Sequence, residues 1–252
     1  MKTLEVLFTP AELAVLPQRD LRGTVCVVFD ILRATSTIIT ALANGAAAVI
    51  PVEEISEAQA WRKKQPGVLL AGERQGVKIR GDRAGEPDFD LGNSPREFTA
   101  EMVRGKTIVT TTTNGTRALR ACRGAKIILA GSFLNLGATA RQLRKIPPKS
   151  LLLVCSGTGE QAALEDTLAA GAMCELLEGD FAGGRTADSA QMARELYLRM
   201  GGDLPGAMRF SANGRRLLAM PELRGDVPFC LQKDVINLTA GLGADGVIRK
   251  ES

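Results

Sequence analysis

Short, continuous apolar runs alternate with alanine-rich segments along the chain. Runs such as VCVVF (25–29) and SLLLVCS (150–156) do not alternate apolar with polar residues, which is typical of parallel strands buried on both faces. Because helical segments separate the runs, the pattern predicts an α/β fold in three layers, α/β/α, with a mostly parallel sheet. The predicted strands are 4–8, 25–29, 47–52, 68–72, 107–112, 126–131, 150–156, 227–231 and 246–250, and the predicted helices are 35–43, 56–64, 95–103, 116–122, 135–145, 161–178, 188–200 and 214–219.

Two pairs of similar segments indicate an internal duplication. The similar segments are TALANGAA (40–47) with TLAAGAM (167–173), and TNGTRAL (113–119) with ANGRRLL (212–218). We interpret the chain as two similar α/β halves, 1–148 and 149–252. A chance match is the alternative, because alanine-rich helices resemble one another without a common origin.

The first half contains a long segment, GERQGVKIRGDRAGEPDFDLGNSP (72–95), that has neither a helical nor a strand period. Loops longer than about 12–15 residues without structure of their own are usually functional or disordered. This segment ends at Ser94-Pro95-Arg96-Glu97, a capping box with proline at the first helical position. We therefore interpret 72–95 as an active-site loop.

The composition excludes several classes of function. The chain has no histidine, so acid–base or metal chemistry has to use carboxylates, cysteine, lysine, tyrosine or metal-bound water. Its five cysteines are scattered and never form a CxxC pair, which argues against a zinc site and for reduced thiols in a cytoplasmic protein. A net charge of +4 without a long basic run, and only 4% aromatic residues, argue against a nucleic-acid partner.

The same sequence argues against a membrane protein. No apolar run approaches the roughly 18 residues of a membrane span, and the N-terminal segment carries acids and prolines too early for a signal peptide. A small anionic ligand is the expected partner of the excess arginine. The oligomeric state is open, with a homodimer as a hypothesis.

The stretch VFDILRATST (28–37) places an acid and a base where an apolar strand meets a helix. Ligands of open α/β sheets bind at such strand ends. Asp30 and Arg33 either pair with each other over the turn, or Asp30 points into a cleft while Arg33 faces an anion. Thr35 or Ser36 is then the N-cap of the helix, whose amides attract the same anion.

A second stretch, TTTTNGT (110–116), ends a strand with an Asn-Gly turn that opens a helix rather than a hairpin. Thr113, Asn114, Gly115 and Thr116 can form a phosphate cradle, because glycine lets the backbone approach a ligand and successive N–H groups bind anions. The alternative is an ordinary β-branched strand followed by an ordinary turn. It is not a Walker loop, since no Gly-Lys-Ser/Thr follows.

The long loop adds further candidates at its two ends. Glu73 and Asp90 each lie beside a turn glycine, which makes them better candidates than the other loop acids, which are usually solvated. Arg74 follows Glu73, and Asn93 and Ser94 close the loop, although Ser94 can also be only an N-cap.

The strand end at 155–156 precedes an acidic pair, Glu165-Asp166, near the start of a predicted helix. The pair either complements the helix dipole or binds a metal. Cys155-Ser156-Gly157 can form a nucleophile elbow, but the chain has no histidine to act as its base and lacks the CxxxxxR spacing of cysteine phosphatases. Carboxylates without histidine or thiolate clusters favour Mg²⁺ over zinc.

Five of these motifs, in this order, resemble the 2-phosphosulfolactate phosphatase (ComB) family. They are VFDILRATST, GERQG, FDLGNSP, TTTNGT and CSGTGE…LEDTLAAG, and the similarity runs from about residue 5 to the C-terminus. The resemblance implies a Mg²⁺-dependent phosphatase that removes phosphate from a small polyanionic 2-phospho acid, on a duplicated three-layer α/β/α fold. The family's named substrate, (R)-2-phospho-3-sulfolactate, belongs to coenzyme M biosynthesis and carries a phosphate, a carboxylate and a sulfonate.

With this resemblance we expect Asp30 to hold Mg²⁺, Arg33 to hold the anion, and a metal-activated water to attack the phosphorus. The predicted site residues are Asp30 and Asp166 for catalysis; Arg33, Ser36, Arg74, Asn93, Ser94, Thr113, Asn114, Gly115, Thr116 and Ser156 for substrate and phosphate binding; and Asp30, Glu73, Asp90 and Asp166 for the metal.

Two alternatives remain open at this point. One is a haloacid-dehalogenase-type phosphatase with Asp30 as nucleophile, although that family has Asp-x-Asp and Leu32 occupies the second position here. The other is a non-catalytic module that binds small anions. A pure anion binder has no reason to gather Asp30, Glu73, Asp90 and Asp166 beside its ligand.

Overall fold

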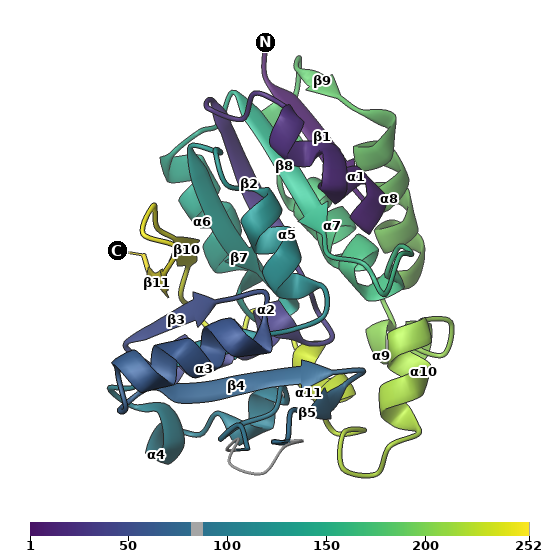
Figure 1. Cartoon of the computed structure of the whole chain (residues 1–252). Coiled ribbons are helices and arrows are strands. Elements are labelled where there is room, and N and C mark those ends of the chain that lie inside the picture. The colour runs from purple at the N-terminus through teal and green to yellow at the C-terminus, as the bar shows by residue number, and fades with distance from the viewer. Residues whose placement is uncertain (82–87, 252) are drawn as a thin grey trace.

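The computed structural model describes residues 1–81 and 88–251, and its centre is one sheet (Figure 1). The strand order is β5-β4-β6-β3-β11-β10-β7-β2-β8-β1-β9. The bounds are β1 Thr3–Leu7, β2 Thr24–Phe29, β3 Ala48–Pro51, β4 Leu69–Arg74, β5 Val77–Lys78, β6 Thr107–Thr111, β7 Ile127–Gly131, β8 Ser150–Cys155, β9 Arg185–Thr186, β10 Ala240–Leu242 and β11 Ile248–Lys250.

The sheet consists of two parallel groups joined by an antiparallel hairpin. One group is β4-β6-β3 and the other is β7-β2-β8-β1-β9. The hairpin β10–β11 lies between them, with Ala240 opposite Ala130 of β7 and Ile248 opposite Val49 of β3. In Figure 1, β3 and β4 lie across the direction of β2 and β8, which brings the carboxyl ends of both groups towards the middle of the molecule.

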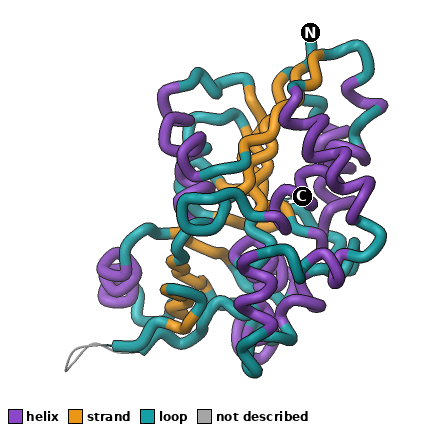
Figure 2. Tube along the Cα trace, turned by 90° about the vertical axis from the view of Figure 1, so that its right-hand side faces the viewer, coloured by secondary structure: helices purple, strands orange, loops and turns teal. Residues whose placement is uncertain are grey.

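Helices cover both faces of the sheet, and Figure 2 shows strands running between them. The bounds of the helices are α1 Pro10–Val15, α2 Ala34–Ala43, α3 Ile55–Lys64, α4 Ala100–Val103, α5 Gly115–Ala121, α6 Leu136–Lys145, α7 Leu164–Leu176, α8 Asp188–Met200, α9 Leu204–Ala207, α10 Ala212–Leu218 and α11 Asp226–Cys230. The predicted three-layer α/β/α arrangement with a mostly parallel sheet is confirmed.

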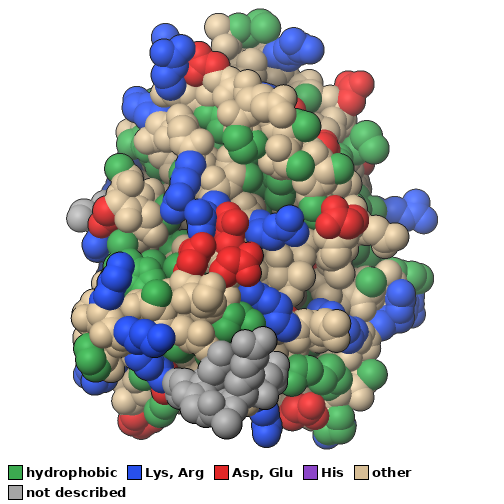
Figure 3. All heavy atoms as spheres, in the orientation of Figure 1, with side chains coloured by type: hydrophobic (Ala, Val, Ile, Leu, Met, Phe, Trp, Pro, Cys, Tyr) green, Lys and Arg blue, Asp and Glu red, His purple; other side chains and the backbone are tan. Residues whose placement is uncertain are grey.

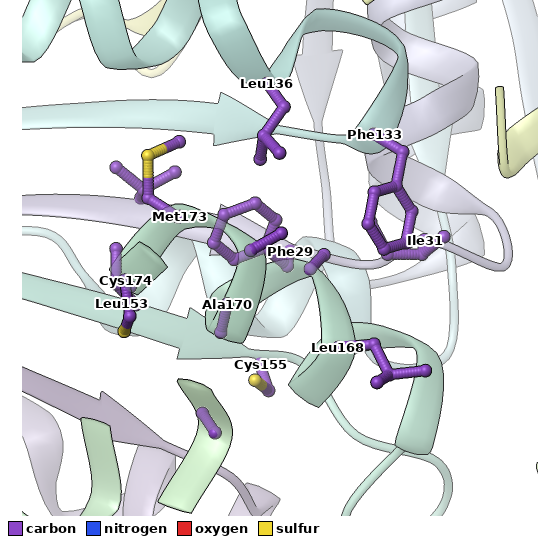
Figure 4. Packing of buried hydrophobic residues seen from close by; sticks show 14 of the residues in the cluster. Phe29, Ile31, Phe133, Leu136, Leu153, Cys155, Leu168, Ala170, Met173 and Cys174 are labelled. Atoms are coloured by element: carbon purple, nitrogen blue, oxygen red, sulfur yellow. The ribbon is translucent and has the colours of Figure 1, made fainter. Parts of the chain in front are cut away.

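The alternation of side chains along β2 explains why this strand is apolar throughout. Val27 and Phe29 pack with α6, α7 and α8 on one face, whereas Cys26 and Val28 pack with α1, α2 and α5 on the other. All six residues of β2 are buried. Figure 4 shows the first of these clusters, in which Phe29 lies among side chains of α7 and neighbouring segments.

Cys155 belongs to the same cluster and is fully buried, and burial raises the pKa of its thiol well above the ordinary value. A buried, protonated thiol is not a nucleophile. All five cysteines are buried and free.

One predicted strand is wrong. Residues 227–231 belong to α11 Asp226–Cys230 and its C-cap, because a short apolar run cannot be distinguished by periodicity from one buried helical turn. The predicted helix 95–103 is also interrupted: Pro95–Glu97 forms a 3₁₀ turn and α4 starts only at Ala100. Ser94 does not cap that turn, because its hydroxyl is bonded to another segment.

Several short elements escaped prediction, among them α1 and β10. Helix α1 follows a complete capping box between Thr9 and Glu12, with Pro10 at the first helical position, and this signal is present in the sequence. Strand β10 is three residues long, too short to show a period.

The two predicted halves share the sheet, since β8 from the range 149–252 pairs with both β1 and β2 from the range 1–148. The internal duplication stays a prediction. The predicted loop 72–95 begins as a hairpin, because β4 is followed by β5, and residues 82–87 of it lie outside the described residues. Within the described part of the chain, no helix has the length and apolar character needed to cross a membrane.

Candidate functional site

The carboxyl ends of β2, β4, β6 and β8 surround a cavity of about 310 Å³. Its walls are formed by Asp30, Leu32, Arg33, Glu73, Gln75, Gly76, Asn93, Thr112, Thr113, Asn114, Gly157, Thr158, Gly159, Asn213 and Arg216, and we call this cavity the cleft. Strand ends of an α/β sheet are the expected place for a ligand. Figure 3 shows the molecule in the orientation of Figure 1, with acidic side chains gathered near the middle and basic side chains beside them.

Asp30 follows β2 directly and is 8% exposed. The N–H of Ala34 donates to its Oδ1 at 3.0 Å, which holds the carboxylate at the start of α2. The pKa of Asp30 is raised to about 6, mainly by burial; the hydrogen bonds from Ala34 and Ser156 lower this pKa, and the charges of Glu73 and Glu165 raise it. The surroundings of Asp30 therefore disfavour its charged form.

Gly115, the first residue of α5, lies against this carboxylate. A Cβ at Gly115 would lie 2.5 Å from Asp30 Oδ2 and 2.5 Å from the Cβ of Ala34, which is closer than real Cβ contacts. The Asn-Gly turn is thus needed for a close approach of α5 to Asp30.

We expect the Gly115→Ala variant to lose activity, because the added methyl group has to displace either the Asp30 carboxylate or α5. Overpacking at such a buried contact costs about 1–3 kcal/mol of stability. Phosphate release and the free energy of unfolding check this. Gly23→Ala is the control for a glycine replacement that does not touch Asp30, because a Cβ at Gly23 would have no atom within 4 Å. Wild-type activity in Gly115→Ala would contradict the prediction.

Asp166, in the first turn of α7, is 2% exposed and joins this helix to the segments that follow β2 and β8. Its Oδ1 accepts from the N–H of Ile31 at 2.8 Å, and its Oδ2 accepts from Ser156 Oγ at 3.1 Å and from the N–H of Gly157 at 3.2 Å. Burial raises its pKa well above the ordinary value, and the charges of Asp30 and Glu165 raise it further.

Glu73, the fifth residue of β4, is 7% exposed and organises the opposite wall of the cleft. Its Oε2 accepts from the N–H of Gly76 at 2.6 Å, and its Oε1 accepts from the N–H of Thr113 at 2.8 Å and from Thr113 Oγ1 at 2.9 Å. Glu73 thereby joins the hairpin turn after β4 to the segment after β6.

Arg33 does not pair with Asp30. Its Nη1 donates to Asp226 Oδ2 at 2.7 Å and its Nη2 donates to the carbonyl of Gly76 at 2.8 Å, with both charged side chains buried. Asp226 also accepts from Ser94 Oγ at 2.6 Å and from Arg96 Nε at 2.8 Å. One buried carboxylate thus holds two arginines and a hydroxyl.

The structure brings together Asp30, Arg33, Glu73, Asn93, Thr113 and Asn114 as walls of the cleft, with Gly115, Ser156 and Asp166 directly behind Asp30. Asn114 Nδ2 donates to the carbonyls of Ser156 and Gly159, so it joins α5 to the loop after β8.

Other predicted residues do not line the cleft. Arg74 donates to the carbonyl of Glu53 and to Thr111 Oγ1, and Asp90 is paired with Arg62 and accepts from the N–H of Leu70. The remaining three are Ser36, whose Oγ donates to the carbonyl of Ile31; Thr116, whose Oγ1 donates to the carbonyl of Thr112; and Ser94, held by Asp226.

Several residues of the site were not predicted, among them Asp226, Thr158, Asn213 and Arg216. Asp226 directly precedes the segment 227–231 that was interpreted as a strand, so no role for a helix-borne carboxylate was considered. Asn213 and Arg216 lie in ANGRRLL, which drew attention only as a repeat. The similarity of this segment to TNGTRAL is a signal that could have indicated a second polar helix start at the cleft.

The cleft suits a hard cation. Among the described residues, the ion pairs involve none of Asp30, Glu73, Glu165 and Asp166, so these buried carboxylates lack a cationic partner. Within the same residues, no three potential ligand side chains are close enough to enclose a metal. Mg²⁺ is commonly held by one or two carboxylates, with water and substrate phosphate as its other ligands, so this donor set fits Mg²⁺.

Comparisons with known proteins identify the family of the chain. The family model described as 2-phosphosulpholactate phosphatase matches residues 11–242. A protein of Thermotoga petrophila named probable 2-phosphosulfolactate phosphatase is 41% identical over 89% of this chain and 92% of the relative. A protein of the same name from Symbiobacterium thermophilum is 39% identical over 88% of this chain and 92% of the relative. A third, from Pseudothermotoga lettingae, is 38% identical over 98% of this chain and 99% of the relative. The chain therefore belongs to the 2-phosphosulpholactate phosphatase family, a family of phosphoric monoester hydrolases.

Proposed function

We propose that this protein hydrolyses the phosphate monoester of a small polyanionic 2-phospho acid in a Mg²⁺-dependent reaction. The proposed substrate is (R)-2-phospho-3-sulfolactate, and the products are 3-sulfolactate and phosphate. The observation that carries the proposal is the convergence of carboxylates without cationic partners and arginine side chains on one cleft at the strand ends. The names of the relatives support the choice of substrate.

In this proposal the phosphoryl group lies between Asp30 and the Thr113–Asn114 turn, and Arg33 faces its oxygens. When bound, Mg²⁺ supplies positive charge that stabilises the charge developing on these oxygens. Asp30, which lines the cleft, would hold it, with the buried carboxyl of Asp166 directly behind. Asp226 and Gly76 hold the side chain of Arg33 in place, so it loses little conformational entropy when the substrate binds.

The bond changes are those of a simple hydrolysis. The oxygen of a water molecule forms a bond to phosphorus while the bond between phosphorus and the C2 oxygen breaks. One proton of the water is released to solvent in the cleft, and the departing C2 oxygen takes up one proton.

We expect phosphate release from (R)-2-phospho-3-sulfolactate to need a divalent cation. Exhaustive treatment with a chelator should lower the rate by at least about 100-fold, since one major source of transition-state charge stabilisation is removed, and added Mg²⁺ should restore it. A panel of phosphorylated hydroxy acids, with and without a sulfonate, measures both the cation dependence and the substrate. Full turnover after chelation would exclude the cation-dependent reaction.

A further inference from the structure

Arg216 is the feature of the cleft that the proposed reaction does not use. It lies on α10, its side chain is exposed, and it is one of the walls of the cleft. Its Nη2 donates to Asn213 Oδ1 at 2.8 Å. Within residues 1–81 and 88–251 it forms no ion pair, whereas Arg33, the other arginine of the cleft wall, is neutralised by Asp226.

The two arginines meet at the same backbone turn. A Cβ at Gly76 would lie 3.5 Å from Arg216 Cζ, and the carbonyl of Gly76 accepts from Arg33 Nη2. Gly76 has φ of +82°, a conformation that glycine adopts readily. The guanidinium groups of Arg33 and Arg216 therefore both lie beside Gly76.

Both guanidinium groups have N–H donors that form no hydrogen bond within the described part of the chain. A guanidinium has five N–H donors. The described contacts use two donors of Arg33 and one of Arg216. The unused donors belong to side chains that line the cleft, so an anion there can accept from both.

Arg216 is held by a buried chain of polar contacts. Asn213, which is 7% exposed, accepts from Arg216 and donates through Nδ2 to Glu165 Oε1 at 2.9 Å and to Thr158 Oγ1 at 2.6 Å. Glu165, 1% exposed, also accepts from Ser211 Oγ at 2.6 Å. A side chain oriented by a buried network loses less freedom when it binds a ligand.

We infer that Arg216 binds the substrate's anionic group farthest from the phosphate, the sulfonate on C3, and thereby sets the preference for sulfonated 2-phospho acids. This inference rests on the proposed function. A sulfonate presents three acceptor oxygens, which accept from the unused donors of Arg216, while Arg33 faces the phosphoryl oxygens. The phosphoryl group then lies beside Asp30.

The test compares two substrates and three variants. Wild type, Arg216→Gln, Arg216→Lys and the control Arg215→Gln are assayed with 2-phospho-3-sulfolactate and with 2-phospholactate, which lacks the sulfonate. Arg215 is the neighbouring exposed residue, bonded only to the carbonyl of Arg209 among the described contacts, and it is not a wall of the cleft. Thermal unfolding of all four proteins checks that they are folded.

We expect Arg216→Gln to lower kcat/KM for the sulfonated substrate about 30-fold, mainly through KM, since a charge-assisted interaction is lost. The loss for 2-phospholactate should be about tenfold smaller, and Arg216→Lys should lie between, because lysine keeps the charge but not the planar fork. Equal losses for both substrates would overturn this inference and leave the proposed function standing. Wild type that releases phosphate from neither substrate would overturn both.

Discussion

We expect the Asp30→Asn variant to lose about 10²–10³ in kcat/KM at standard Mg²⁺ concentration, the scale of removing one preorganised charge from an active site. Asparagine has nearly the same shape and keeps an oxygen for the N–H of Ala34. The substitution removes only the negative charge of Asp30, which lies beside Gly115 and is proposed to hold the cation. Excess Mg²⁺ should therefore recover part of the rate.

The same variant separates the two mechanisms for Asp30. If Asp30 were a nucleophile, an amide could not form the acyl-phosphate, and no concentration of Mg²⁺ would help. Trapping of phosphate on Asp30 by acid quench of wild type during turnover would overturn the role of Asp30 as a cation ligand. Asp20→Asn is the matched control, because Asp20 is exposed and paired only with Arg22.

The stability of Asp30→Asn provides a check that the variant is folded. Burial raises the pKa of Asp30 from 3.8 to about 6, so its carboxyl favours the folded state below pH 3.8, and this contribution is lost as the pH rises through about 6. Without added metal, Asp30→Asn should therefore unfold at a higher temperature than wild type at pH 8. At pH 4 the difference should be small.

The second large effect is expected at Asp226. The Asp226→Ala variant should lose about 3–5 kcal/mol of the free energy of unfolding, because it leaves the buried guanidinium of Arg33 without a counter-charge. It also releases Ser94 and Arg96, so the segment after the long loop loses its attachment to α11. Phosphatase activity should fall as well, since Arg33 is no longer held at the cleft.

Chemical denaturation measures this loss, and Asp245→Ala provides the comparison. Asp245 pairs with Arg249, but both side chains are about half exposed, and such pairs contribute about 0–1 kcal/mol. A double variant, Arg33→Met with Asp226→Leu, should be more stable than Asp226→Ala, because it removes both charges from the interior. An Asp226→Ala protein within about 1 kcal/mol of wild type would contradict the role of this ion pair.

The sequence predicted those parts of the site that depend on local patterns. Asp30, Glu73 and Asn114 follow apolar runs, and the rule that parallel strands end at one edge was enough to bring them together. The Asn-Gly turn was interpreted correctly as a helix start, with α5 beginning at Gly115.

The other parts depend on contacts between distant segments, which a local pattern does not contain. The partner of Arg33 is 193 residues away, and it directly precedes an apolar run that was assigned to a strand. Asp90 has the sequence context of a functional acid, yet Arg62 of α3 neutralises it. Composition indicates an excess of arginine, but only the fold decides which arginines remain without a carboxylate.

The antiparallel hairpin between the two parallel groups has a consequence for biosynthesis. Val49 of β3 and its partner Ile248 are roughly 200 residues apart, so the ribosome delivers β3, β6 and β7 long before the hairpin that joins them. During translation, the edge of β3 that later pairs with β11 and the edge of β7 that later pairs with β10 have no partner strand, and such open edges readily pair with other chains. Nascent copies on one messenger are therefore most prone to associate with each other in this interval, and the arrival of β10–β11 ends it.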